Sequence, residues 1–179
     1  MQSQAPTPAR VVVLSSSAHN MGNVDPSDLH FTKGRIYSPW VAYGQSKQAD
    51  LLFAKALAEK TKGSNVTSVS VHPGVIATAL WRSSGALLTA FVNMFVMDKT
   101  VPQGASCTVY AAVAPEMQLE KNRGIYLCDC HESRPTCEVA RDIDGTFSKH
   151  MYEVVENEIN SVVDSWKTKT STGDSNQKK

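Results

Sequence analysis

A run of apolar, mostly β-branched residues, Arg10-Val-Val-Val-Leu14, places the strongest constraint on how this chain folds. The run has no polar alternation, so it predicts a strand that is buried on both faces of a parallel sheet. A second run, Val66-Thr-Ser-Val-Ser-Val71, is also rich in β-branched residues and stops just before Pro73-Gly74, where proline cannot continue a strand ladder. Both runs therefore predict strands of one sheet.

Helical patterns alternate with these strands. The apolar residues of this stretch recur at helical spacing and Gly63 ends the pattern, which predicts a helix over about 42–60; they are Leu51, Leu52, Ala54, Leu57 and Ala58. Three more elements are expected downstream: a helix at 103–114 between Pro102 and Pro115, a short strand at 124–128, and an amphipathic helix at about 144–166. This order predicts the α/β class, with a doubly wound, Rossmann-like parallel sheet and flanking helices.

The overall composition is that of one soluble domain. A length of 179 residues is enough for a sizeable core, and a net charge of +1 argues against a nucleic-acid-binding surface. Residues 1–10 lack the apolar core of a signal peptide, so we expect a cytoplasmic protein. We expect residues 1–9 to be disordered, 10–166 to form the α/β unit, and 167–179, which is polar, to be a disordered tail.

Two further patterns bear on metal binding and on membrane contact. The four cysteines are Cys107, Cys128, Cys130 and Cys137, and the spacing of Cys128-Asp-Cys130-His131 is tighter than zinc sites use, so we expect free thiols and no metal. The apolar stretch Ala86–Met97 is too short for a bilayer, which takes about 20 residues. It predicts a buried or pocket-lining helix, with peripheral contact to an intracellular membrane as the alternative.

The motif Tyr43-Gly-Gln-Ser-Lys47 carries the clearest chemical signal. Its two ends are four residues apart, so both side chains share one helix face. An ammonium held close to a phenol favours the phenolate, which makes the phenol a useful proton donor and acceptor near neutral pH. By itself the motif is weak, because most such pairs are solvated helix surface. Whether this pair belongs to a catalytic site depends on the other residues that the fold places beside it.

Polar residues follow both predicted strands at their carboxyl ends. Ser15, Ser16 and Ser17 follow the first strand, and Pro73-Gly74 follows the second. Ligands of open α/β sheets bind outside the carboxyl ends of the strands, so we expect these residues to converge with Tyr43 and Lys47 at one edge. A serine at such a position, taken alone, would be an ordinary turn residue. His72 is better explained as a packed loop residue than as a catalyst.

In this combination and order, the motifs resemble the carboxyl-terminal half of a short-chain dehydrogenase/reductase. The resemblance runs from about Arg10 to Cys130 and is strongest to the branch of retinol-dehydrogenase-like and WW-domain-containing oxidoreductases. The segments that carry it are Arg10-Val-Val-Val-Leu-Ser-Ser-Ser-Ala-His19, Ala42-Tyr43-Gly-Gln-Ser-Lys47, Val69-Ser-Val-His72-Pro73-Gly74-Val-Ile-Ala-Thr78, Gln103-Gly-Ala-Ser-Cys-Thr-Val-Tyr-Ala-Ala112 and Gly124-Ile-Tyr126.

The resemblance implies a role for each matched residue. Ser16 corresponds to the serine that hydrogen-bonds the substrate oxygen, with Ser15 and Ser17 as alternatives. Tyr43 corresponds to the general acid and base, and Lys47 to the residue that activates it and contacts the nicotinamide ribose. Residues that border the nicotinamide correspond to Pro73, Gly74 and Thr78. The implied cofactor is NADP or NAD, and the implied substrate is a lipophilic alcohol or carbonyl compound.

The family's amino-terminal half has no counterpart in the sequence. No glycine-rich turn follows a predicted strand, so the pyrophosphate cradle and the amino-terminal βαβ units are not expected here. We therefore expect a truncated oxidoreductase that is inactive alone. The alternatives are a non-enzymatic module that pairs with a full-length relative, or an incomplete gene product. Substrate identity and the choice between NAD and NADP stay open, as does dimerisation.

Overall fold

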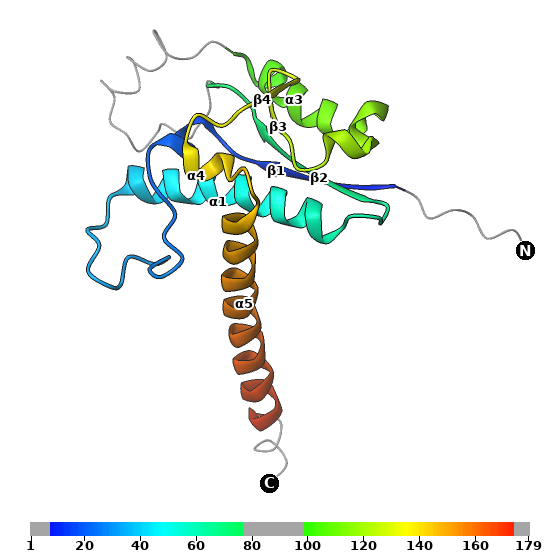
Figure 1. Ribbon diagram of the computed structural model, residues 1–179. Helices are drawn as coiled ribbons and strands as arrows, with labels where there is room; N and C mark the ends of the chain where they lie inside the picture. Colours follow the sequence, from blue (N-terminus) through cyan, green and yellow to red (C-terminus); the bar gives the residue numbers. More distant parts are fainter. Residues whose placement is uncertain (1–7, 77–98, 174–179) are drawn as a thin grey trace, which may run out of the picture.

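A four-stranded sheet between helices forms the body of the molecule (Figure 1). The computed structural model describes residues 8–76 and 99–173. The strands are β1 (Ala9–Leu14), β2 (Val66–His72), β3 (Tyr126–Cys128) and β4 (His131–Ser133). The helices are α1 (Pro39–Lys60), α3 (Val101–Val113), α4 (Glu138–Arg141) and α5 (Thr146–Gly173), with 3₁₀ turns η1 (Ser17–Asn20), η3 (Pro115–Gln118) and η4 (Glu120–Asn122). The predicted α/β class is confirmed.

The strand order is β1-β2-β3-β4, and the first three strands are parallel. In register, Leu14 lies beside Val71, and Val71 lies beside Leu127. The last strand departs from the expected purely parallel sheet, since β4 is antiparallel to β3. The turn between them has positive φ at Asp129 (53°) and Cys130 (63°), as a two-residue hairpin turn requires. Neither position is a glycine, so the usual signal of a hairpin turn is absent from the sequence here.

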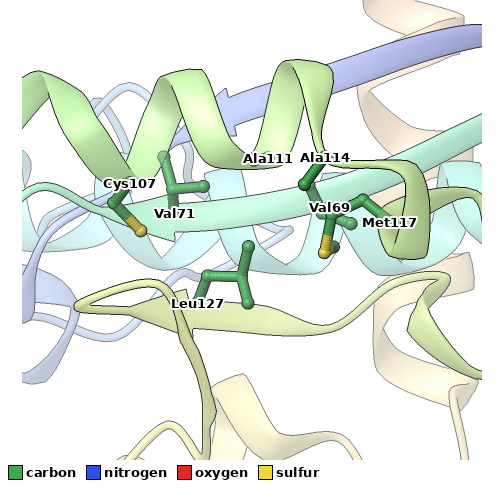
Figure 2. Packing of buried hydrophobic residues seen from close by; sticks show 7 residues of the cluster. All are labelled: Val69, Val71, Cys107, Ala111, Ala114, Met117 and Leu127. Atoms are coloured by element: carbon green, nitrogen blue, oxygen red, sulfur yellow. The ribbon is translucent and has the colours of Figure 1, made fainter.

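Helices cover both faces of the sheet (Figure 1). On one face α3 packs on β2 and β3 through a core of Val69, Val71, Cys107, Ala111, Ala114, Met117 and Leu127 (Figure 2). On the other face lies α1, whose Leu52 packs with Val24 and with Met151 of α5. Since Val69 and Val71 point toward α3, the alternate residues Ser68 and Ser70 point to the opposite side and are equally buried. The sheet is thus buried on both faces, as the apolar runs predict.

Capping residues set the helix boundaries. Thr100 forms a capping box with Gln103, so α3 begins at Val101 rather than at residue 103. Proline at the first position suits the start of a helix, and α1 accordingly begins at Pro39, three residues before the expected start. The carboxylate of Asp142 accepts hydrogen bonds from the backbone N–H groups of Phe147 and Ser148 at the start of α5.

The last helix is longer than the sequence suggested. α5 continues to Gly173, so the expected helix end at Trp166 and the expected disorder of 167–173 are both wrong. The polar composition of that stretch led to this error, because a helix already formed can extend at little cost per residue. Thr78, the stretch Ala86–Met97 and the chain ends 1–7 and 174–179 lie outside the described residues. Among the helices that are described, none has the length and apolar character to cross a bilayer.

Leu52 offers a test of the packing between α1 and α5. Its side chain is fully buried among residues of two other segments, so Leu52→Ala should lower the free energy of unfolding by about 2–5 kcal/mol. The matched control is Leu57→Ala on the same helix, where the side chain is only half-buried and the loss should be clearly smaller. Chemical denaturation of both variants measures the difference. Equal losses would show that α1 does not pack as described.

Candidate active site at the carboxyl edge of the sheet

The carboxyl ends of β1 and β2 meet at one edge of the sheet. Their register continues past the last paired residues, because the backbone N–H of Ser15 donates to the carbonyl oxygen of Val71 at 2.8 Å. Ser15 and Ser16 therefore leave the sheet next to His72, Pro73 and Gly74. The parallel pairing of β1 and β2 thus brings the loops that follow them together, as the sequence predicts.

Two hydrogen bonds fasten α1 to the end of β1. The ammonium of Lys47 donates to the carbonyl oxygen of Leu14 at 2.8 Å, and the hydroxyl of Ser15 donates to the carbonyl oxygen of Lys47 at 2.7 Å. Lys47 also forms an ion pair with Asp50 at 2.8 Å. The Lys47 nitrogen lies 6.0 Å from the centre of the Tyr43 ring. Tyr43 and Lys47 thus share one face of α1 and lie at the carboxyl edge.

The three serines of the loop have different environments. Ser15 is buried and its proton is engaged by Lys47, while Ser17 is exposed. Ser16 is half-buried and caps η1, where its side-chain oxygen accepts from the backbone N–H of Ala18 at 3.2 Å. As an acceptor in that bond, the hydroxyl still has its own proton to donate to a substrate oxygen. These environments favour Ser16 over its two neighbours.

Two glycines let α1 approach the serine loop closely. A Cβ atom on Gly44 would lie 2.7 Å from the nitrogen of Gly22 and 2.8 Å from the carbonyl oxygen of Ala18. A Cβ on Gly22 would lie 2.3 Å from the carbonyl oxygen of Val41. Both contacts are with backbone, which cannot move aside cheaply. The glycine that follows Tyr43 therefore fixes the distance between the tyrosine and the loop, a role that sequence reasoning missed.

A buried glutamine supports the same loop from inside. The side-chain oxygen of Gln48 accepts from the backbone N–H of Val24 at 2.6 Å, and its amide nitrogen donates to the sulfur of Cys137 at 2.9 Å. The amide also contacts the carbonyl oxygen of His19 at 3.4 Å. Gln48 is completely buried, although its sequence context gave no sign of this beyond its place on an otherwise apolar face. It connects α1, the loop and the segment before α4.

A second tyrosine lies behind the serine loop. The rings of Tyr126 and His19 meet edge to face, with centroids 5.6 Å apart. Burial raises the pKa of Tyr126 far above its ordinary value, so its phenol stays neutral. His19 in turn contacts the carbonyl oxygen of Ser16 through Nδ1 at 2.6 Å. Tyr126 is thus a packing residue, and its neutral phenol does not suit an acid–base role.

The loop after β2 lies against α3 and Lys99, since a Cβ atom on Gly104 of α3 would lie 3.4 Å from the carbonyl oxygen of Pro73. Gly74 has a φ of 86°, a conformation that favours glycine, and a Cβ there would lie 2.6 Å from the side chain of Lys99. Lys99 pairs with Asp129 in the β3–β4 turn, and this hydrogen bond lowers the pKa of Asp129 below its ordinary value. Pro73 and Gly74 therefore lie packed against neighbouring residues at the edge. Thr78, the third residue expected to border the nicotinamide, lies outside the described residues.

The donors at this edge suit one end of a nicotinamide dinucleotide. Ser16, Tyr43 and Lys47 offer two hydroxyls and an ammonium, which match a substrate oxygen and a ribose. In residues 8–76 and 99–173, no strand is followed by a glycine-rich turn of the kind that holds a pyrophosphate. The fit is therefore limited to the nicotinamide end.

Other candidate sites lie away from this edge. Two surface pockets have volumes of about 600 and 380 Å³ and are lined around Tyr152 and Arg123, without Ser16, Tyr43 or Lys47. In the part of the chain that the structure describes, no three histidine, cysteine or acidic residues are grouped to hold a metal ion, and the four cysteines are free. The polar edge remains the arrangement with the clearest chemistry.

Comparison with curated proteins finds relatives of one kind. The chain is 39% identical over 123 residues to retinol dehydrogenase 11 of Mus musculus, an alignment that covers 69% of this chain and 38% of that protein. It is 40% identical over 131 residues to the chloroplastic short-chain dehydrogenase TIC 32 A of Brassica napus, covering 71% of this chain and 40% of that protein. It is 44% identical over 133 residues to polyprenol dehydrogenase of Mus musculus, covering 71% and 38%. The chain thus spans about 40% of the length of the curated relatives it matches.

A solved structure gives a matching fold. An uncharacterised protein from Mycobacterium paratuberculosis superposes with a TM-score of 0.54 at 27% sequence identity, over 83% of this chain and 49% of that one. No protein-family model matches the chain.

The close approach at Gly44 is directly testable. Gly44→Ala should push α1 away from the serine loop and lower the free energy of unfolding by about 1–3 kcal/mol, the usual range for overpacking. Ser46→Ala, at an exposed position two residues later on α1, is the control and should change stability little. Thermal and denaturant unfolding of both variants gives the measurement. A Gly44→Ala protein as stable as the parent would mean that the helix and the loop are farther apart.

Proposed function

The aligned part of the chain belongs to the short-chain dehydrogenase family, and we propose that it forms the catalytic, nicotinamide end of an NAD(P)-dependent alcohol–carbonyl oxidoreductase site. The observation that carries this proposal is the fastening of α1 to the end of β1, which holds Tyr43 and Lys47 beside the loop of Ser16. The same edge carries the Pro73-Gly74 loop.

Each residue has a definite part in the proposed reaction. Ser16 donates a hydrogen bond to the substrate oxygen and holds it beside Tyr43. Tyr43 takes the hydroxyl proton during oxidation and returns it during reduction. Lys47 places a positive charge 6.0 Å from the centre of the Tyr43 ring, and its remaining N–H group suits a ribose hydroxyl. A bound nicotinamide would supply the hydride acceptor and donor, and Pro73 and Gly74, with Thr78, would border it.

The proposed substrate is a lipophilic alcohol or its carbonyl product. Support comes from the relatives, two of which are named as dehydrogenases of retinol and of polyprenol. In dinucleotide-binding folds the residue that distinguishes NAD from NADP follows the second strand of the amino-terminal half, and no such strand lies among residues 8–76 and 99–173.

The proposed acid and base can be tested when the chain is joined to the amino-terminal half of a retinol dehydrogenase relative. Tyr43→Phe removes the transferable proton with little change of volume, so turnover should be abolished while cofactor binding is largely kept. Lys47→Ala should harm both, and Ser16→Ala should lower turnover by about 10²-fold. Tyr37→Phe, at a tyrosine that is 64% exposed, is the matched control and should keep full activity. Wild-type turnover in Tyr43→Phe would overturn the assignment.

The isolated chain should not bind NADH or NADPH below millimolar concentration. Micromolar affinity needs about 8 kcal/mol, and the hydrogen bonds at the nicotinamide end contribute only about 1 kcal/mol each. Calorimetric titration of the purified chain with each cofactor measures this directly. A clear micromolar isotherm would show that the missing pyrophosphate contacts are supplied in another way.

One observation favours a second candidate function, that of a non-enzymatic module which pairs with a full-length relative. Among the described residues, β1 is hydrogen-bonded along one side only, to β2, although its sequence suits a strand with neighbours on both sides. If this is the function, Tyr43→Phe should leave the pairing with the relative intact. The turnover assay with the joined protein then separates the two functions.

A further inference from the structure

The second half of α5 carries an exposed apolar stripe. Ile159, Val162 and Trp166 are 56%, 65% and 65% exposed, and Val163 beside them is 39% exposed. Their spacing of three and four residues places them on one face of the helix. Such a stripe on a helix surface is typical of a helix that packs against another helix.

This stripe continues a face that is already in use. In the first half of α5, Met151 is buried and packs with Leu52 of α1, and Phe147 and Val155 pack around them. Figure 1 shows that the helix then leaves the body of the molecule while keeping its direction. The apolar face thus runs on past the end of the part that α1 covers. Trp166 and its neighbours lie where a second helix would extend the same packing.

We propose that this stripe, Ile159 to Trp166, is the contact through which two copies of the chain pair, with their α5 helices antiparallel. Charge placement determines the direction. Glu156 lies just before the stripe and Lys167 just after it, eleven residues apart, which is about three turns and hence the same flank of the helix. In an antiparallel pair with two-fold symmetry, Glu156 of each copy faces Lys167 of the other.

The parallel arrangement is disfavoured by the same charges. It would bring the flank with Glu156 against the opposite flank of the second helix, where Glu158 lies at the same level. Glu156 and Glu158 of the two helices would repel each other in the parallel pair, whereas the antiparallel pair places Glu156 beside Lys167. An anionic membrane is disfavoured as the occupant too, because Glu153, Glu156, Glu158 and Asp164 outnumber the lysines along the described part of this helix.

The charged residues have weak partners within the chain. Glu156 accepts from Lys60 at 3.2 Å, and Lys167 pairs with Asp164 at 3.6 Å, all of them well exposed. Exposed ion pairs of this kind contribute little, so exchanging these two for pairs across a dimer would cost little. The stripe is only about two turns long, less than a stable interface of standard size needs, so the dimer should be weak and should form as concentration rises.

The first experiment measures the mass of the full-length chain by sedimentation over a range of concentrations. The parent should move from monomer toward dimer, and Ile159→Glu should abolish this by placing a charge in the stripe. Ser161→Glu, an exposed position on another face of the same helix, is the matched control and should dimerise like the parent. Circular dichroism checks that both variants keep the helix. A parent that stays monomeric throughout, or an Ile159→Glu variant that still dimerises, overturns the proposal.

The second experiment is a charge exchange. Glu156→Lys and Lys167→Glu should each weaken the dimer about fivefold or more, because each puts like charges together at two symmetric places. The double variant should restore it, while Lys60→Met, which removes the partner of Glu156 within the chain and the cation over the Tyr152 ring, should leave it unchanged. Failure of the double variant to restore dimerisation overturns the antiparallel pairing. Tight binding of the monomer to phosphatidylserine-containing vesicles through Trp166, in place of dimerisation, also overturns it.

Discussion

The position of α1 on the end of β1 is the constraint on which the rest of the structure depends. The carbonyl oxygen of Leu14 accepts from Lys47, and the carbonyl oxygen of Lys47 accepts from Ser15, so the helix and the strand hold each other's backbone. Gly22 and Gly44 allow the contact to be close. The bonds go to backbone oxygens, whose positions the sheet and the helix already fix, so the candidate site takes its rigidity from secondary structure.

This arrangement explains why the pair of Tyr43 and Lys47, a weak motif by itself, marks a candidate site here. A tyrosine and a lysine one turn apart occur on many helices, and on most of them they face water. Here the face that they share is turned toward the carboxyl edge of a parallel sheet, next to a serine that caps a tight turn and a proline–glycine loop that lies against Lys99. Inner residues such as Gln48 and Tyr126 hold the loop from behind. The chemistry therefore depends on the assembled edge rather than on any single residue.

The two ends of α5 have different surroundings. Its first half is capped by Asp142 and packed on α1, which makes it part of the domain core. Its second half extends away from that core with the same apolar face exposed (Figure 1). A helix nucleated and capped at one end can propagate at little cost, so the packed half supports the exposed half. That face is the one through which we propose that two copies pair.

The sequence by itself determined the elements, their order and the residue types at the site. Local periodicity gives the strands at 10–14 and 66–71 and the helices between them, and the parallel order already places Ser16 and Pro73 at one edge with Tyr43. Tertiary structure decided what periodicity does not contain: the antiparallel β4, the helix beyond Trp166, the burial of Gln48 and the close approach at Gly44. These features depend on which segment lies opposite a residue. Contacts between residues far apart in the chain set that choice, and no local pattern records it.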